Sequence, residues 1–238
     1  MKKFSQRDDA KEILDDLEVQ GEAVSQNLKE LDLINTLLGG NAISVAALKT
    51  VLNLYPAKKH WKVADLGCGS GHLMLEMRKV FEQKNCTAEF TGFDANAFIV
   101  KYAQIHCASD SSIRILCHNV LTDPFPEVYD IVHASLFLHH FTADELVLLL
   151  TKLKQHTATA LVINDLHRHP LAYYAIKWLT GLFSKSYLVQ HDAALSVAKG
   201  FKKSEWTTIL ERAGYKRYTT KWVWAFRHQV IIYPDTSR

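Results

Sequence analysis

The spacing of apolar residues changes near residue 60. Before that point, apolar residues recur at helical intervals over 13–17 and again over 28–38. This predicts helices that end at Gly39-Gly40, and a further short helix over 41–54. From Trp61 onward, short apolar runs alternate with helical stretches. Such alternation is typical of βαβ units built around a parallel sheet.

Five strands and three intervening helices follow from this alternation. Ser204 has the side chain of a helix N-cap, and we expect its helix to reach Ala213 and to stop at Gly214. The β-rich segments 218–226 and 229–233 are joined by a tight connection, which predicts an antiparallel pair at the edge of the sheet. The predicted parallel strands cover 62–66, 88–93, 113–117, 130–134 and 160–164, and the helices cover 71–81, 96–106 and 143–153.

The chain of 238 residues has the size of one large domain with an appendage. We expect an N-terminal helical cap over residues 1–57 and an α/β core over residues 58–238. Residues 167–203 form an insertion in that core, rich in aromatic residues, that the alternating pattern does not place on the sheet.

Composition excludes several classes of protein. Lys+Arg 28 against Asp+Glu 25 gives a net charge of +3, too near balance for a dedicated nucleic-acid binder. The longest aliphatic run, 146–150, is too short for stable membrane insertion, although peripheral membrane contact stays open. Acidic, helix-forming sequence after Met1-Lys2-Lys3 is unlike a secretory signal. Four separated cysteines give no disulfide framework or zinc-finger spacing, so we expect a cytoplasmic protein.

A glycine-rich turn follows the first predicted strand. Gly67, Gly69 and Gly71 allow a sharp turn and a close approach of backbone amides to a ligand. The dinucleotide fingerprint G-x-G-x-x-G is not met, since His72 replaces the third glycine. Asp65 also disfavours a pyrophosphate, because it adds negative charge beside the ligand.

Three further elements stand at the ends of later strands. Asp94-Ala95 ends the second strand, where a carboxylate can accept hydrogen bonds from both ribose hydroxyls. Asn119-Val120 follows the third strand, and the fourth runs through Ala134-Ser135 to His139-His140. Together with the D-x-G-x-G-x-G turn, these elements resemble the class I S-adenosylmethionine-dependent methyltransferases over roughly residues 61 to 233.

The resemblance implies a Rossmann-like seven-stranded sheet of order 3-2-1-4-5-7-6, with the last strand antiparallel and helices on both faces. It implies S-adenosyl-L-methionine as cofactor, a donor that carries a sulfonium and an ammonium group and therefore suits an acidic turn. The residues that it assigns to cofactor binding are Asp65, Gly67, Gly69, Gly71, Asp94, Ala95, Asn119, Val120, Ala134 and Ser135.

Acid–base chemistry is expected just after the fourth and fifth strands, because ligands of open α/β sheets lie beyond the carboxyl ends of the strands. We predict His140 as the base and Asp165 as the carboxylate that orients it. His139 could exchange roles with His140, and His140 could instead pack against the donor. A metal held by His167 and His169 with these two histidines is a minority interpretation, because such sites rely on an acidic cluster and Asp165 has no neighbouring acid, so no metal site is assigned.

The insertion and the N-terminal helices must select the acceptor. Residues 171–183 form an aromatic amphipathic helix, either a lid over an apolar pocket, which could also touch a membrane, or a helix packed on the sheet edge. We predict substrate contacts from Tyr173 and Trp178, and from Arg168 if it does not pair with a local acid.

Residues 27–40 and 163–168 resemble a bacterial subgroup associated with type III polyketide synthases and flavin oxidoreductases, which implies phenolic or quinone lipids as acceptors. The predicted function is therefore methylation of a small, aromatic, lipophilic acceptor, at oxygen. A carbon methyltransferase of quinone biosynthesis and a non-catalytic binding or scaffold protein are the alternatives. RNA methylation is less favoured, because Ala134–Phe137 replaces an N-P-P-Y tetrapeptide. A homodimer stays open.

Overall fold

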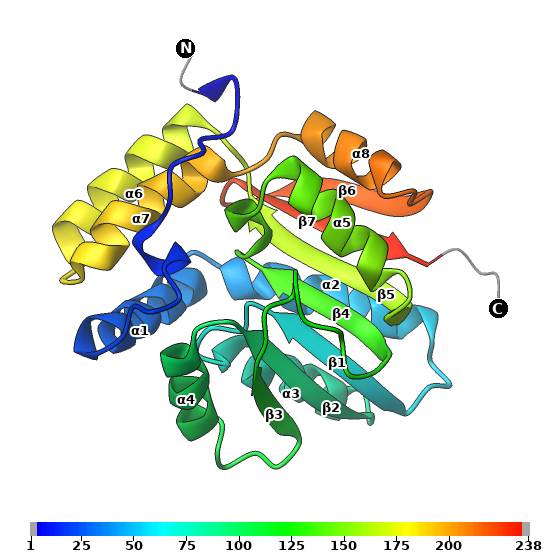
Figure 1. Cartoon of the computed structure of the whole chain (residues 1–238). Helices are drawn as coiled ribbons and strands as arrows, with labels where there is room; N and C mark the ends of the chain where they lie inside the picture. The colour runs from blue at the N-terminus through cyan, green and yellow to red at the C-terminus, as the bar shows by residue number, and fades with distance from the viewer. Residues whose placement is uncertain (1–3, 235–238) are drawn as a thin grey trace.

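A seven-stranded sheet runs through the centre of the molecule in the order β3-β2-β1-β4-β5-β7-β6 (Figure 1). The computed structural model describes residues 4–234, so residues 1–3 and 235–238 of the two expected units lie outside it. β1 to β5 pair in parallel, whereas β7 is antiparallel to both β5 and β6. The expected sheet order and orientation are confirmed. The strands are β1 His60–Leu66, β2 Thr87–Asp94, β3 Ile113–Cys117, β4 Tyr129–Ser135, β5 Thr157–Leu166, β6 Arg217–Val223 and β7 Arg227–Tyr233.

Helices cover both faces of the sheet because successive strand residues point to opposite sides. In β1, Val63 packs in the core under α2, α3 and α4, while its neighbour Ala64 packs in the core under α5 and α8. Both residues are fully buried. The helices are α1 Glu22–Leu37, α2 Gly40–Leu54, α3 His72–Gln83, α4 Ala97–His106, α5 Ala143–Leu153, α6 Pro170–Phe183, α7 Tyr187–Lys199 and α8 Lys203–Arg212.

Several predicted boundaries differ from the observed ones by up to three residues, as in β5, and two of the differences have clear local reasons. Lys202, and not Ser204, is the N-cap of α8, because its backbone amide donates to the Glu205 carboxylate at 2.7 Å. Strand β6 ends at Val223, three residues early, because 224–226 form the turn into β7.

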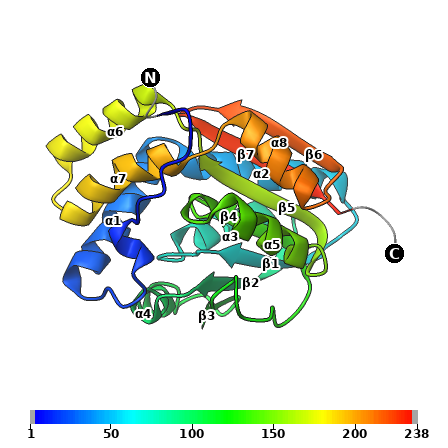
Figure 2. The same cartoon turned by 45° about the horizontal axis from the view of Figure 1, so that its top comes forward.

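Residues 4–19 form an extended segment, called here the N-terminal strap. Its predicted helix shrinks to a single 3-10 turn, Ile13–Asp15, because the backbone amides of Ile13 and Leu14 donate to Asp192 of α7. Figures 1 and 2 show the strap crossing from α7 towards α1 and α4. At its far end, Asn96 donates to the Val19 carbonyl at 2.8 Å. The strap therefore spans the carboxyl edge of the sheet.

The insertion folds as a helical pair, with α6 lying outside α7 (Figure 2). α7 contacts α1 as well as the sheet, and the chain rejoins the sheet through a bridge between His167 and Phe201. α2 packs directly on β5 and β7, while α1 reaches outward to α4 and α7. Within residues 4–234 no single helix has the length and apolar composition of a membrane span. Taken together, α1 and α2 reach that length and composition, but the chain bends by 66° between them.

Candidate active site

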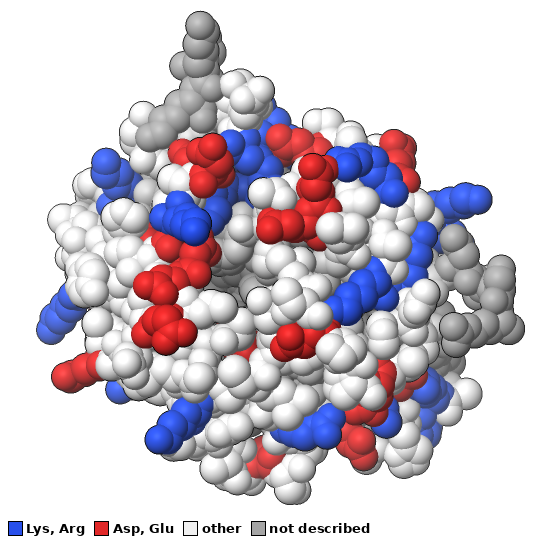
Figure 3. All heavy atoms as spheres, in the orientation of Figure 1, with Lys and Arg blue, Asp and Glu red and all other residues white. Residues whose placement is uncertain are grey.

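One large cavity, of about 1340 Å³, opens at the carboxyl ends of the parallel strands. Its walls are the glycine turn, the ends of β2 and β4, helices α1, α6 and α7, and the N-terminal strap. Figure 3 shows a hollow in this face of the molecule with acidic side chains beside it. The volume exceeds the roughly 300–1,000 Å³ of a site for one drug-sized ligand, so two molecules can be held together.

The glycine turn forms the floor of the cavity. Gly67 (φ 64°) and Gly69 (φ 52°) have left-handed backbone conformations and both line the cavity. A Cβ on Gly67 would collide with the ring of Phe137, whereas one on Gly69 would meet nothing closer than Leu28 at 3.8 Å. Space beside Gly69 is therefore open to a ligand, and Gly67 is required by the close approach of Phe137.

Asp94 closes β2 beside this turn. Its carboxylate accepts the backbone amides of Asn96 at 3.0 Å and Gly69 at 3.3 Å. Burial raises the pKa of Asp94 to about 6, although these backbone hydrogen bonds and the charge on His140 oppose the rise. A buried carboxylate held at a cavity wall is suited to accept hydrogen bonds from ligand hydroxyls.

Asp65 belongs to a buried polar network. The Nδ1 of His133 contacts Asp65 at 2.6 Å, and its Nε2 contacts the Ser44 hydroxyl at 2.9 Å. Asn164 donates to the same hydroxyl at 3.0 Å and to Ser135 at 3.2 Å. This network ties α2 to β1, β4 and β5, so Asp65 has a structural partner besides its place on the cavity wall.

Most of the residues predicted to bind the cofactor share this cavity. Ala134 lies in the core, and Gly71 lies behind the turn with Cys107 against it, so neither reaches the cavity. The predicted contacts of these two residues with the donor therefore have no support in the cavity lining. The predicted residues that line the cavity are Asp65, Gly67, Gly69, Asp94, Ala95, Asn119, Val120 and Ser135.

The predicted pair of His140 and Asp165 is wrong. Asp165 accepts from the Nδ1 of His139 at 2.7 Å and from the backbone amides of Leu138 and His139 at 2.9 and 3.2 Å. Burial alone would raise the pKa of Asp165, but the charge and hydrogen bond of His139 hold it below its usual value. Asp165 therefore orients His139, because the backbone turn after β4 directs that ring inward.

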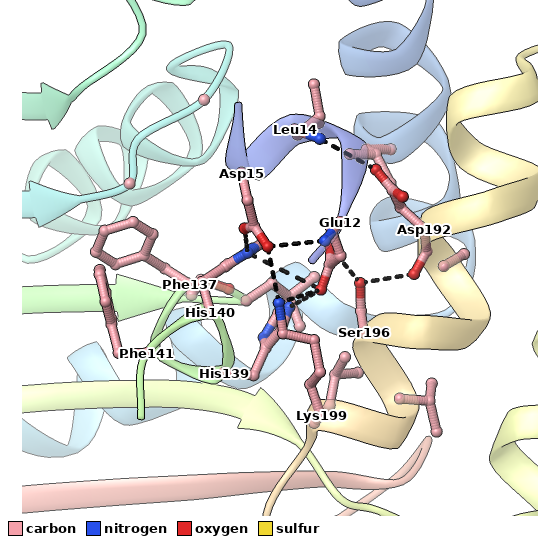
Figure 4. A pocket seen from close by; sticks show the side chains of 18 of the residues that line it. Glu12, Leu14, Asp15, Phe137, His139, His140, Phe141, Asp192, Ser196 and Lys199 are labelled. Atoms are coloured by element: carbon pink, nitrogen blue, oxygen red, sulfur yellow. Dashed lines mark hydrogen bonds and ion pairs between the residues drawn. The ribbon is translucent and has the colours of Figure 1, made fainter. Parts of the chain in front are cut away.

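His140 has a different carboxylate partner, Asp15 of the N-terminal strap. Its Nδ1 lies 2.5 Å from Asp15 (Figure 4), and no described residue bonds to its Nε2. Burial lowers the pKa of His140, but the bond to Asp15 and the charges of Glu12 and Asp15 raise it overall above its ordinary value. The ring stacks on His139, with centroids 4.4 Å apart. His140 is thus a histidine on the cavity wall with one nitrogen held by a carboxylate.

Lys199 of α7 completes this cluster. Its Nζ lies 3.3 Å from Glu12 and 3.0 Å from Asp15 (Figure 4). Glu12, His139 and His140 bring possible metal-ligand atoms within 4.8 Å of one another. However, the ammonium group of Lys199 already supplies a positive charge between the two carboxylates. The cluster is therefore consistent with an ion-paired closure of the strap, with no metal assigned.

Two of the three predicted acceptor contacts lie away from the cavity wall. Arg168 is 1% exposed and pairs in a fork with Glu205, at 2.6 and 3.0 Å, so its prediction as a substrate ligand is wrong. Tyr173 packs edge-on against Phe4, with ring centroids 5.4 Å apart, and does not line the cavity. Trp178 does line it, at the mouth, where its side chain is largely exposed.

Glu12, Asp15 and Lys199 are candidate functional residues that the sequence did not indicate. No motif surrounds them, and 184 positions separate Asp15 from Lys199. Only the density of acidic residues in the strap, at positions 8, 9, 12, 15, 16 and 18, marks the region as unusual.

Comparisons with known proteins agree with this geometry. Residues 63–159 match a family model described as a methyltransferase domain. Carboxy-S-adenosyl-L-methionine synthase of Photobacterium profundum is 28% identical over 119 residues, which make up 49% of this chain and 45% of that protein. The matched part thus spans less than half of that curated relative.

Solved structures share the fold at low sequence identity. Human N-acetylserotonin methyltransferase in complex with S-adenosylmethionine is 20% identical, with a TM-score of 0.65 over 92% of this chain and 57% of that chain. Magnesium protoporphyrin IX methyltransferase of Synechocystis PCC 6803 with bound S-adenosylhomocysteine is 15% identical, with a TM-score of 0.56 over 84% of each chain.

Proposed function

We propose that this chain is a class I S-adenosylmethionine-dependent methyltransferase and that it methylates an oxygen atom of a small, aromatic, lipophilic acceptor. The observation that carries the proposal is that Asp94 and His140 line the same cavity. A group suited to hold a ribose and a group suited to take a proton thus face one space.

The residues on the floor of the cavity fit the donor. Asp94 would hold the ribose hydroxyls, and the open backbone at Gly69 would lie against the methionine part. Asp65 adds a carboxylate that favours the ammonium group. When bound, S-adenosylmethionine supplies an electrophilic methyl group on a sulfonium.

The upper wall of the cavity suits an apolar acceptor. Its lining includes Leu31 and Ile34 of α1, Leu38 at the C-cap of that helix, and Ile176 and Leu179 of α6. Such a lining favours a lipophilic molecule over an ionic one. The two structural neighbours named above are, by their names, methyltransferases of small molecules. We extend the proposal to phenolic or quinone-type lipids, as the resemblance of residues 27–40 and 163–168 implies.

We assign proton transfer to His140. Its Nε2 would accept the proton of an acceptor hydroxyl, and Asp15 would hold the ring through Nδ1 and stabilise the resulting imidazolium. His139, fixed by Asp165, would support the ring of His140 from behind. An oxygen acceptor loses its proton as it accepts the methyl group, and a base held beside the cavity supports O-methylation in this way.

The test is a methyl-transfer screen read by mass spectrometry. Purified protein and S-adenosylmethionine are incubated with phenols, quinones and tRNA, and products are scored for one added methyl group and for the atom that carries it. We expect transfer to phenolic oxygen, lost in the Asp94→Ala variant. Transfer to ring carbon would support the quinone C-methyltransferase alternative. Donor binding without transfer to any acceptor would support a binding or scaffold protein.

A further inference from the structure

The outer face of α6 is apolar and exposed to solvent. Leu171, Tyr174, Trp178 and Leu182 are 66%, 61%, 68% and 58% exposed. Their spacing of three and four residues places them on one stripe of the helix. Ala172 and Thr180 on the opposite side are buried towards α7. A surface helix ordinarily exposes its polar side to water, whereas α6 exposes an apolar side.

Exposed aromatic residues at the end of β6 and in the turn to β7 extend this apolar stripe. Trp222 and Trp224 are 53% and 71% exposed. Both rings lie near Phe226, whose ring stacks on His169, the N-cap of α6, at 5.0 Å. The exposed faces of α6 and of the turn are therefore continuous, and we call them together the docking face: Leu171, Tyr174, Trp178, Leu182, Trp222 and Trp224.

The two segments that form the docking face carry basic but no acidic residues, although the carboxylate of Glu30 in α1 accepts hydrogen bonds from Ser184 and from the backbone amides of Lys185 and Ser186 just after α6. No Asp or Glu occurs between residues 166 and 191, or between residues 213 and 234, although the whole chain has Asp+Glu 25 against Lys+Arg 28. Lys177, Lys185 and Lys221 are exposed in these segments. Exposed Trp and Tyr interleaved with lysine are the composition that binds the headgroup region of an anionic bilayer.

The docking face also reaches the cavity. Trp178 and Trp224 both line its mouth, together with the apolar residue Leu179. The opposite side of the cavity is bordered by the acidic strap, which an anionic surface would repel. The border at α6 and the β6–β7 turn is therefore apolar, whereas the border at the strap carries more acidic than basic residues.

We propose that the docking face binds the surface of an anionic lipid bilayer, and that an acceptor dissolved in that bilayer enters the cavity between Trp178 and Trp224. The entry step rests on the function proposed above, whereas binding to the bilayer does not. Pairing of two copies through this face is disfavoured, because it would gather Lys177 and Lys185 of both copies around one contact.

Vesicle co-sedimentation tests the docking face without requiring activity. The whole protein is mixed with vesicles of phosphatidylcholine alone or of phosphatidylcholine with an equal share of phosphatidylglycerol. We expect binding to the mixed vesicles and weak binding to the neutral ones. Each substitution Lys177→Glu or Lys185→Glu should weaken binding to mixed vesicles by about 5-fold or more, because each removes an attraction and adds a repulsion.

Apolar variants separate the bilayer from a purely electrostatic surface. The double variant Tyr174→Ser with Leu182→Ser lies outside the cavity lining and should lower vesicle binding by about 10-fold or more. Matched controls are Leu148→Ser on α5 and Ile105→Ser on α4, which are 70% and 72% exposed on other surfaces. They should bind vesicles like the unmodified protein.

Three outcomes would overturn the proposal: no difference between the two vesicle types, controls as impaired as the docking-face variants, or a dimer in light scattering that Leu182→Ser dissociates. The last would identify the face as an interface between copies. Loss of vesicle binding with methyl transfer to a soluble phenol intact would confirm docking and leave the proposed function standing. Vesicle binding by the unmodified protein without methyl transfer to any acceptor would confirm docking and contradict the proposed function.

Discussion

The two sides of the cavity are built in different ways. On the donor side, the glycine turn and Asp94 are close in sequence, and Asp94 bonds to the amide of Gly69, 25 positions away. On the strap side, Asp15 meets His140 across 125 positions and Lys199 across 184. One side depends on backbone geometry next to two parallel strands, and the other depends on ion pairs between distant segments.

The electrostatics differ in the same way. Asp94 is a partly buried carboxylate for which residues 4–234 supply no cationic partner in direct contact, and desolvation raises its pKa to about 6. Asp15 is also desolvated, yet its bonds to His140 and Lys199 lower its pKa well below the usual value. The donor side therefore keeps an unpaired charge ready for a ligand, whereas the strap side neutralises its charges internally. Variants on each side should consequently fail differently.

The largest effect is expected from His140→Ala. If His140 accepts the acceptor proton, turnover on an alcohol or weakly acidic phenol should fall ~10²–10⁴-fold, with donor affinity unchanged. A phenol acidified by electron-withdrawing groups should lose less, because it arrives already deprotonated. Rates are measured by product formation under saturating donor. The control is His60→Ala, because His60 lies at the end of β1 opposite to the glycine turn. Near-normal turnover in His140→Ala would remove it from proton transfer.

Asp94→Ala should act on the donor instead. Loss of two charge-assisted hydrogen bonds should weaken donor binding by ~10-fold to several hundred-fold, as measured by titration calorimetry. In the unmodified protein, affinity should also decline as the pH falls towards about 6, where Asp94 becomes protonated. Unchanged affinity in the variant would exclude Asp94 from the ribose site.

Asp94 also predicts an opposite effect on stability. Because its folded pKa is raised, the folded state prefers the neutral carboxyl, and the charged form destabilises the protein as the pH rises through about 6. Asp94→Asn should therefore raise the melting temperature of the donor-free protein at neutral pH while weakening donor binding. A lowered melting temperature would show that the carboxylate is structural.

On the strap side, Asp15→Asn tests whether the carboxylate bonded to His140 affects turnover. It should slow turnover by roughly 10-fold, because His140 loses a charged hydrogen-bond partner. Since Asp15 raises the pKa of His140, the rise of the rate with pH should move to lower pH in the variant. A purely structural role for Asp15 would reduce the rate at all pH values without moving the profile. The exposed neighbour Asp16→Asn is the control.

The same pair sets a pH window for closure of the strap. The raised pKa of His140 means that its pairing with Asp15 is complete below the ordinary histidine pKa of 6.5 and is lost as the pH rises through the folded value. The lowered pKa of Asp15 means that the pairing is lost again only in strong acid. Hydrogen exchange of residues 8–15 should accordingly increase at alkaline pH in the unmodified protein and be less dependent on pH in Asp15→Asn.

A smaller effect is expected at the mouth. Trp178→Ala should raise the KM of a soluble aromatic acceptor by about 5-fold, because only part of the ring is removed from water, and should leave donor affinity intact. Tyr173→Ala, whose ring packs on Phe4 outside the cavity lining, should not change that KM. Equal losses of stability and of both affinities would mark α6 as a packing helix only.

Metal removal should have the smallest effect. Because Lys199 supplies the positive charge beside Glu12 and Asp15, treatment with EDTA should leave turnover within about 2-fold of the untreated enzyme. A loss restored by one divalent cation would show instead that Glu12, His139 and His140 bind a metal.

The contrast between the two sides also explains what the sequence could predict. Strand ends, turn glycines and Asp94 follow from local hydrophobic pattern and turn chemistry, so the fold and most of the cavity floor can be predicted from the sequence. The side chains that pair with the histidines cannot be predicted in this way. Which of two adjacent rings meets Asp165 depends on the 3-10 turn Leu138–His140, and nothing in residues 12–15 indicates a partner in β4 or α7. Arg168 is likewise predicted to bind the substrate, because nothing in the sequence indicates that it pairs with Glu205, 37 positions later.

The N-terminal strap has a consequence for the order of folding. Its bonds to Ser196 and Lys199 close loops of 184 residues, and Arg7 reaches the Lys199 carbonyl across 192. Contacts of such sequence separation form late, since the entropy of closing the loop must be offset by structure already in place. During synthesis, the strap must wait until nearly the whole chain has left the ribosome before α7 can receive it. The donor side can form earlier, because its contacts join residues that are much closer in the sequence, such as Gly69 and Asp94.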